Sequence, residues 1–215
     1  MRAVLFGVVA ALLTISQGVT LSQSSARPRA AIDITDEQVK KVNSSPGIDR
    51  QLRIVDMGEY NLAVGIIHRG PTGAGRGSAG SAAGRGAAPA AAPAPCGESG
   101  GATSGVRGIA HDATTETYII TSGSGTLVTG GHIVTGRRSA PDSPVTTILN
   151  GPSCSGPIGG ADIVRRVVKP GDIIIIPAGV PHGWTDIADH VDYLSVRPDP
   201  EKVLQAGYVH PLIAQ

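Results

Sequence analysis

The sequence predicts an all-β fold of short antiparallel strands with short flanking helices. Apolar runs rich in β-branched residues recur along the chain, and turn residues separate them. The clearest run, Ile173–Ile176, follows Gly171-Asp172 and stops at Pro177, which cannot donate to a strand ladder. The 215 residues fit a single β-domain. Because aromatic residues make up only 3% of the chain, we expect a core of isoleucine, valine and leucine.

Eight runs of the sequence are predicted to form strands. They span residues 60–68, 117–121, 125–129, 145–149, 163–168, 173–176, 183–187 and 191–196. A loop rich in Gly, Pro and Ser is expected between the fourth and fifth of these runs, and it contains Cys154.

The chain is predicted to hold one domain with flanking segments. Residues 27–59 form an N-terminal helical or extended segment, 60–200 the barrel, and 201–215 a C-terminal tail. Residues 70–105, rich in Gly, Ala and Pro, are expected to be a flexible insertion in the barrel. A helix is predicted over residues 35–43, where Thr35 and Gln38 form a capping box. A second short helix is expected at the start of the tail, over residues 199–204.

Residues 1–26 are typical of a signal peptide. A short basic start precedes an apolar run from Ala3 to Ile15, which is too short to span a bilayer comfortably, and small polar residues follow. We expect cleavage between Gly18 and Ala26 and export to the periplasm or the medium. An uncleaved N-terminal anchor is the alternative, and no other segment is expected to span a membrane.

The two cysteines are interpreted in the light of export. Cys96 and Cys154 both lie among turn residues. In an oxidising compartment an even pair of this kind most simply forms a disulfide, and two free thiols are the alternative.

The charge balance argues against polyanionic partners. The chain has 18 basic and 17 acidic residues, a formal net charge of +1. Neither nucleic acid nor an anionic membrane surface is therefore expected as a partner.

The stretch that begins at Lys169 resembles the second conserved motif of the cupin superfamily, G-x5-P-x-G-x2-H-x3-N. Four residues match the pattern: Gly171, Pro177, Gly179 and His182. Asp186 stands where the motif has its final asparagine.

An upstream stretch resembles the first cupin motif, G-x5-H-x-H-x3,4-E-x6-G. His111 takes the second histidine position, Glu116 the glutamate position and Gly123 the final glycine position. Ile109 stands where the first histidine belongs. The resemblance covers roughly residues 61–200 and implies a small antiparallel jelly-roll barrel.

The resemblance also implies a metal site. His111, Glu116 and His182 would form a two-histidine, one-carboxylate set that leaves coordination positions open. Iron, manganese, zinc, nickel or copper, as divalent first-row transition metals, are all compatible with these ligands. A degenerate barrel that holds no metal is the alternative.

Further candidates follow from strand alternation. His68 shares a face with Leu62, Val64 and Ile66, the more apolar face of its strand, so we expect it to point into the barrel as an extra ligand or general base. A solvated strand-end histidine is the alternative.

The remaining candidates are residues of the predicted barrel strands. Tyr118, Tyr193 and Arg197 are catalytic candidates that could orient a substrate oxygen or pair with a carboxylate, although packing or a rim salt bridge would also explain each of them. Trp184 and Asp186 share a face with His182 and are expected at the cofactor or substrate pocket, Trp184 as a wall.

The function predicted from these features is that of an exported metal-binding cupin. An enzyme of the oxygenase or oxidoreductase type, or of the lyase or isomerase type, acting on a small polar organic molecule is favoured. A metal-free, non-catalytic cupin that binds a sugar or small metabolite is the alternative. A homodimer is possible because exposed sheet edges favour pairing.

Overall fold

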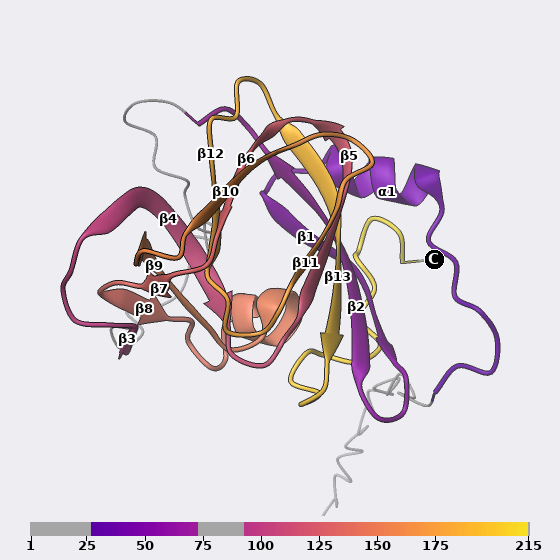
Figure 1. Cartoon of the computed structure of the whole chain (residues 1–215). Helices are drawn as coiled ribbons and strands as arrows, with labels where there is room; N and C mark the ends of the chain where they lie inside the picture. The colour runs from indigo at the N-terminus through magenta and orange to yellow at the C-terminus, as the bar shows by residue number, and fades with distance from the viewer. Residues whose placement is uncertain (1–26, 73–92, 215) are drawn as a thin grey trace, which may run out of the picture.

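Two antiparallel β-sheets face each other in the computed structural model, which describes residues 27–72 and 93–214 (Figure 1). The predicted signal peptide and most of the predicted insertion lie outside the described residues. The sheets form the antiparallel jelly-roll architecture that the sequence predicts, so this prediction is confirmed.

The first sheet has five strands. In spatial order they are β1 (Asp49–Asp56), β2 (Asn61–Arg69), β13 (Val191–Asp199), β5 (Glu116–Gly123) and β11 (Ile173–Ile176). Strand β1 lies before the predicted start of the barrel at residue 60, and sequence analysis did not identify it as a barrel strand.

The second sheet has eight strands. The order is β10 (Val164–Val168), β6 (Gly125–Thr129), β12 (His182–Thr185), β4 (Thr103–His111), β9 (Ser153–Gly159), β8 (Gly136–Arg138) and β3 (Pro95–Cys96), with β7 (His132–Ile133) paired to β9. The end of the predicted insertion therefore contributes β3 and the start of β4 to this sheet.

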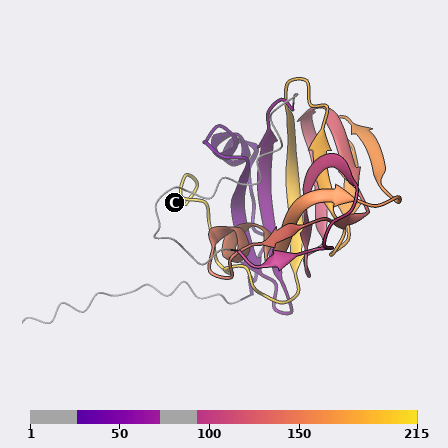
Figure 2. The ribbon, with the colours of Figure 1, turned by 90° about the vertical axis from the view of Figure 1, so that its left-hand side faces the viewer.

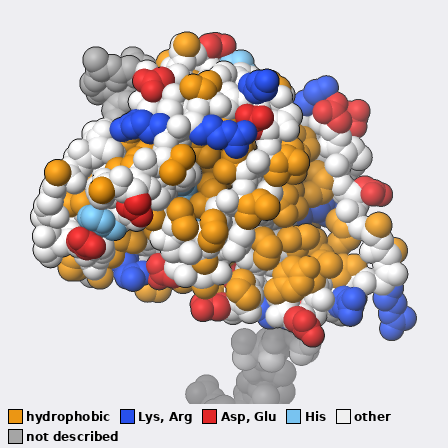
Figure 3. Space-filling model, viewed as in Figure 1, with side chains coloured by type: hydrophobic (Ala, Val, Ile, Leu, Met, Phe, Trp, Pro, Cys, Tyr) orange, Lys and Arg blue, Asp and Glu red, His pale blue; other side chains and the backbone are white. Residues whose placement is uncertain are grey.

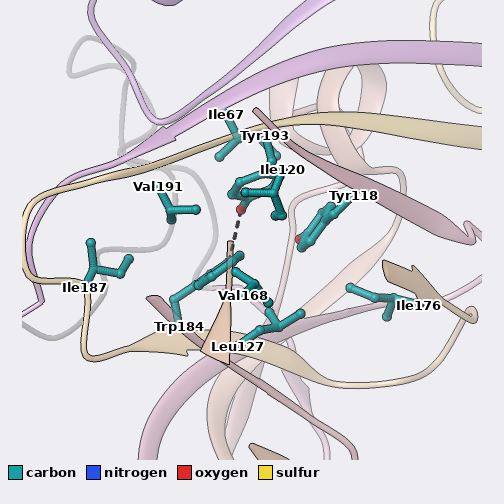
Figure 4. Packing of buried hydrophobic residues seen from close by; sticks show 10 residues of the cluster. All are labelled: Ile67, Tyr118, Ile120, Leu127, Val168, Ile176, Trp184, Ile187, Val191 and Tyr193. Carbon is teal, nitrogen blue, oxygen red and sulfur yellow. Dashed lines mark hydrogen bonds between the residues drawn. The ribbon is translucent and has the colours of Figure 1, made fainter. Parts of the chain in front are cut away.

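An apolar core fills the space between the sheets. It contains Tyr118, Trp184 and Tyr193 among aliphatic side chains from both sheets (Figure 4). The indole nitrogen of Trp184 donates a hydrogen bond of 3.1 Å to the Tyr193 hydroxyl, which satisfies both buried polar groups. Three of the six aromatic residues of the chain thus lie together in an otherwise aliphatic core.

A second core covers the outer face of β1 and β2. Helix α1 (Asp36–Asn43) lies there beside the C-terminal segment (Figures 1 and 2). The predicted capping box is present, with Thr35 and Gln38 each accepting from the other's backbone N–H at 3.3 Å. Val42 of the helix and Ile213 of the C-terminal segment pack with Leu52 and Ile66.

Three predicted elements differ from the structure. Residues 145–149 form a π-helical turn, η1 (Val145–Asn150), rather than a strand. Ser143 starts it by accepting backbone hydrogen bonds from Thr146 and Thr147, and Pro144 favours a helical first turn. The predicted loop with Cys154 is strand β9, which pairs with β4 across five aligned residues from 107 to 111. The predicted helix at 199–204 is a series of turns.

The disulfide prediction is confirmed. Cys96 and Cys154 are bonded, with their Cα atoms 6.0 Å apart. The bond ties the edge strand β3 to β9 across β8.

Exposed apolar side chains lie on the last strand of each sheet. Val164 and Val167 belong to β10, and Ile173 and Ile175 belong to β11. Hydrophobic side chains also spread across the middle of the face in Figure 3. The homodimer stays a prediction.

No helix among the described residues is long and apolar enough to cross a membrane.

Candidate metal centre

The two sequence motifs meet at one point of the barrel. His111 ends β4, Glu116 begins β5 and His182 begins β12. One ligand atom from each residue lies within 4.8 Å of the others. All three side chains are buried, with exposed fractions of 3%, 1% and 2%. The three residues implied by the motif resemblance therefore form a cluster of potential ligands.

A backbone hydrogen bond at a turn links the second motif to the first. Pro177 ends β11, and Gly179 adopts a φ of 80°, a conformation that favours glycine. The backbone N–H of Gly179 donates a 2.7 Å hydrogen bond to the carbonyl oxygen of His111. Because this turn leads directly into β12, the bond fixes where His182 lies relative to His111.

Arg197 and Ser195 hold one oxygen of Glu116. Oε1 accepts hydrogen bonds from Ser195 Oγ at 2.6 Å and Arg197 Nε at 2.7 Å. Arg197 also donates to Asp49 Oδ2 at 2.7 Å and to the carbonyl oxygen of Leu149 at 3.1 Å. This anchoring leaves Oε2 of Glu116 to face the two imidazoles.

Glu116 is held as a carboxylate. Its burial by itself would raise its pKa, but the positive charge of Arg197 and the imidazole contacts outweigh burial. The pKa of Glu116 therefore lies well below its ordinary value. His111 behaves differently, because burial lowers its pKa despite the neighbouring carboxylate and so favours the neutral imidazole.

Hydrogen bonds fix the tautomer of both imidazoles. Nδ1 of His182 lies 3.0 Å from the carbonyl oxygen of Val180, which can only accept, so Nδ1 carries the proton. Ser153 donates its hydroxyl proton to the carbonyl oxygen of Gly151, so its Oγ accepts from Nδ1 of His111 at 3.0 Å. In its neutral form each ring would therefore present an unprotonated Nε2, as a metal ligand must.

The two Nε2 atoms lie close to the same carboxylate oxygen. Nε2 of His111 lies 3.2 Å and Nε2 of His182 lies 3.1 Å from Oε2 of Glu116. Nε2 of His182 is buried and has no hydrogen-bond partner among the described residues. When both rings are neutral, three acceptor atoms meet here and a cation among them would remove their repulsion, so the donor set fits a divalent first-row transition metal.

A cavity of about 410 Å³ opens onto the centre, within the usual size range of small-molecule sites. Ile109 lines it and lies directly opposite His182 in the β4–β12 pair. The residue at the missing histidine position thus places an apolar side chain beside the centre.

Tyr118 also lines the cavity, and burial, followed by the charge of Glu116, raises its pKa well above the ordinary value. Its hydroxyl therefore stays protonated.

The other predicted site residues are spread over several environments. Arg197 lies behind Glu116 and also lines the cavity. Tyr193 and Trp184 belong to the apolar core beside Tyr118. Asp186 is exposed and adopts a φ of 52°, a conformation in which Asp and Asn are both enriched. Asp186 therefore shapes the turn after β12 and lies outside the cavity lining.

The expectation that His68 points into the barrel is wrong. Its side chain is 44% exposed and its Nδ1 contacts Asp192 Oδ1 at 2.6 Å, away from the cavity. The opposite face of β2, with Ile67 and Arg69, lines the cavity. The apolar face that carries His68 is instead covered by α1 and the C-terminal segment, so it belongs to the second core.

Sequence analysis missed several residues that build the centre. Asp49, Ser153 and Ser195 complete its hydrogen-bond network. Strand alternation does place Ser195 on the same face as Arg197, because the two are separated by one residue on β13, but it assigns Ser195 no role. Asp49 and Ser153 carry no such signal, because they reach the centre only through the tertiary fold.

Comparisons with known proteins give remote likenesses in structure. No protein-family model and no curated protein matches the sequence significantly. A protein from Bacillus halodurans is 11% identical, with 86% of this chain and 92% of that chain covered and a TM-score of 0.41. An RmlC-like cupin from Methanocaldococcus jannaschii with a double-stranded β-helix fold is 13% identical, with coverages of 74% and 89% and a TM-score of 0.34.

An oxalate oxidase in complex with glycolate is a further structural neighbour. It is 13% identical, and the match covers 77% of this chain but only 56% of that chain, with a TM-score of 0.35. Likenesses this remote carry nothing about activity.

The fold is an antiparallel jelly-roll barrel of the kind found in cupins, and the centre lies where the two motif resemblances place it. Two facing antiparallel sheets surround one cavity, and both motifs deliver their ligand residues to it.

Proposed function

We propose that this protein is an exported, metal-dependent cupin enzyme that acts on a small polar organic molecule. The reaction is of the oxygenase or oxidoreductase type, or of the lyase or isomerase type. The observation that carries the proposal is the buried pair of Nε2 atoms, from His111 and His182, that lies within 3.2 Å of Oε2 of Glu116, with Nδ1 of each ring already hydrogen-bonded elsewhere. Such a set is suited to binding a cation and serves no purpose in apolar packing.

His111, Glu116 and His182 would hold the metal. A bound metal would supply Lewis acidity or activation of dioxygen. The residues around it have separate roles. Arg197 and Ser195 keep the carboxylate ionised and oriented, Tyr118 offers a protonated hydroxyl to a bound molecule, and Ile109 keeps one side of the centre apolar.

The disulfide supports export. Disulfides such as Cys96–Cys154 persist in oxidising compartments and are rare in the cytosol. The proposal of a signal peptide over residues 1–26 is independent of this bond and agrees with it.

Metal analysis of the mature protein tests the proposal. The protein is purified from the exported fraction without chelating resin, beside His182→Ala and a control, His132→Ala, whose histidine lies outside the cavity. We expect near-stoichiometric metal in the parent and in the control and its loss in His182→Ala. Oxygen-uptake and lyase screens with the retained metal then separate the two reaction types.

A protein that takes up no iron, manganese, zinc, nickel or copper would overturn the proposal. The alternative function, a metal-free barrel that binds a sugar or small metabolite, would then be tested by ligand binding in the presence of chelator.

A further inference from the structure

Arginine side chains dominate the charged lining of the cavity. In residues 27–72 and 93–214, five arginines and two carboxylates line it: Arg69, Arg107, Arg137, Arg138 and Arg197, with Asp49 and Glu116. Both carboxylates already form ion pairs with Arg197. The charge that remains toward the cavity is therefore positive, and a divalent metal at the centre would increase it.

Strand β4 leads from the centre to the cavity mouth. Arg107, Ile109 and His111 alternate along the strand, so they share one face, and all three line the cavity. His111 is buried, Ile109 is half-buried and Arg107 is exposed. A molecule that enters therefore meets a cation first, then an apolar side chain, and then the metal ligands.

A row of residues across four strands places Arg137 on the same face. Arg137 on β8 lies opposite Ser155 on β9, Ser155 lies opposite Ile109 on β4, and Ile109 lies opposite His182 on β12. Three strand spacings separate the backbones of Arg137 and His182, or about 14 Å. Side chains from both ends of the row project into the same cavity.

Besides Arg197, two of these arginines already have partners within the protein. Arg138 forms an ion pair with Asp112, and Nε of Arg69 donates to the Tyr193 hydroxyl at 2.8 Å. Arg107 and Arg137 form no ion pair within the described part of the chain, and both are exposed at the cavity. Their planar guanidinium groups match the paired oxygens of a carboxylate or a phosphate group.

We propose that the cavity selects small organic oxyanions, which Arg107 and Arg137 bind at its mouth. The rest of the bound molecule passes Ile109 and reaches the centre formed by His111, Glu116 and His182. This proposal deepens the proposed function and depends on it only for where the reaction takes place. Carboxylates and phosphate esters share the recognised chemistry, and the experiment separates them.

Calorimetric titration of the metal-loaded mature protein tests the proposal. The probes are malonate, its neutral diamide malonamide, and glycerol 3-phosphate. Each is titrated into the parent, Arg107→Gln, Arg137→Gln, the double variant and a control, Arg165→Gln, an exposed arginine on β10 outside the cavity. Elemental analysis of every variant checks that metal content is unchanged.

We expect the parent and the control to bind one of the two anions and to bind malonamide much more weakly. Each single variant should lose about tenfold in affinity for that anion, and the double variant more. Added salt should weaken the binding, since the mouth is open to solvent. Malonate also chelates metals, so its binding to the parent alone does not test the proposal. The loss of malonate affinity in the Arg107 and Arg137 variants does.

Two outcomes separate this proposal from the proposed function. Metal-loaded protein whose anion affinity is the same in the parent and in the double variant would overturn the arginine proposal and leave the metalloenzyme intact. Protein that retains no metal, yet binds an anion through Arg107 and Arg137, would overturn the metalloenzyme and support the arginine site.

Discussion

Glu116 keeps its negative charge in a buried site because protein groups replace water around one of its oxygens. Arg197 and Ser195 occupy Oε1 at 2.7 and 2.6 Å. Arg197 is itself buried and is shared with Asp49. Such an arrangement costs a great deal if one member is removed, since the remaining charges stay buried without compensation.

Replacing Arg197 with methionine should therefore destabilise the protein strongly. Glu116 and Asp49 would lose their shared cation, and we expect the free energy of unfolding to fall by about 3–5 kcal/mol. Urea unfolding followed by fluorescence of Trp184, the one tryptophan of the chain, measures the change.

The control for this experiment is Arg165→Met, which removes an exposed arginine from β10. It should change the free energy of unfolding by no more than about 0.5 kcal/mol. If Arg197→Met were as mild as the control, the buried ion pairs would contribute little to the fold.

At the scale of elements, which face of a strand points into the barrel depends on what packs against its opposite face. The inner face of β2 carries Ala63 and Gly65, although its outer face is more apolar. A Cβ at Gly65 would lie 3.2 Å from the carbonyl oxygen of Arg50 and 3.4 Å from Nη1 of Arg197. Small residues here leave room for the buried Arg197 guanidinium.

This packing explains which elements the sequence could predict. Strand β11 and helix α1 were predicted because their turn residues and caps are local signals. The orientation of β2 was not, because α1 and the C-terminal segment create a second apolar face that alternation cannot distinguish from the first. The β-branched run at η1 predicts a strand from its composition. Its helical form depends instead on Ser143 and on tertiary contacts, which composition does not show.

The candidate site was predictable to a similar extent. His111, Glu116 and His182 occupy spaced motif positions, and the structure brings them together. Asp49 reaches Arg197 across 148 positions of sequence, so no local pattern could indicate that pair.

The disulfide is the element that closes the far edge of the eight-stranded sheet. It joins β3 to β9, and β8, which carries Arg137, lies between them. Strand β3 has only two residues, so its hydrogen bonds alone hold it weakly.

Removing both cysteines should destabilise the protein. The bond closes a sequence separation of 58 residues, and loop entropy of that size corresponds to about 4 kcal/mol. Urea unfolding of the Cys96→Ser, Cys154→Ser double variant measures the loss, and reduction of the parent with dithiothreitol provides the matched comparison. If neither treatment shifts the unfolding midpoint, the disulfide contributes nothing to stability.

At the scale of the whole molecule, the centre joins the two sheets. Glu116, Ser195, Arg197 and Asp49 come from the five-stranded sheet, whereas His111, Ser153 and His182 come from the eight-stranded sheet. Protonation of the centre should therefore affect the stability of the entire fold.

The metal-free protein should lose stability as the pH falls. The pKa of His111 is lowered from 6.5 in the folded state, so the unfolded chain takes up a proton first and stability declines below about pH 6.5. The pKa of Glu116 is lowered well below 4.5, so its stabilising contribution is present above pH 4.5 and is lost as the pH falls through the folded value. Urea unfolding of chelator-treated protein between pH 7 and pH 3 measures both effects.

Glu116→Gln provides the comparison for this pH series. The variant should be less stable than the parent at pH 7, and the difference should shrink below pH 4.5 because the glutamine has no charge to lose. A parent protein that becomes more stable toward pH 4 would contradict the assigned charge states.

If the protein is exported and binds metal as proposed, the division of the ligands between two sheets also bears on how long it survives outside the cell. A metal held at the centre would cross-link the two sheets, because His111 and His182 lie on one and Glu116 on the other. Protein molecules without metal would separate more often at the boundary between the two sheets, and extracellular proteases cleave chains that are opened in this way. The supply of metal outside the cytoplasm would then set both the active fraction of the protein and its lifetime.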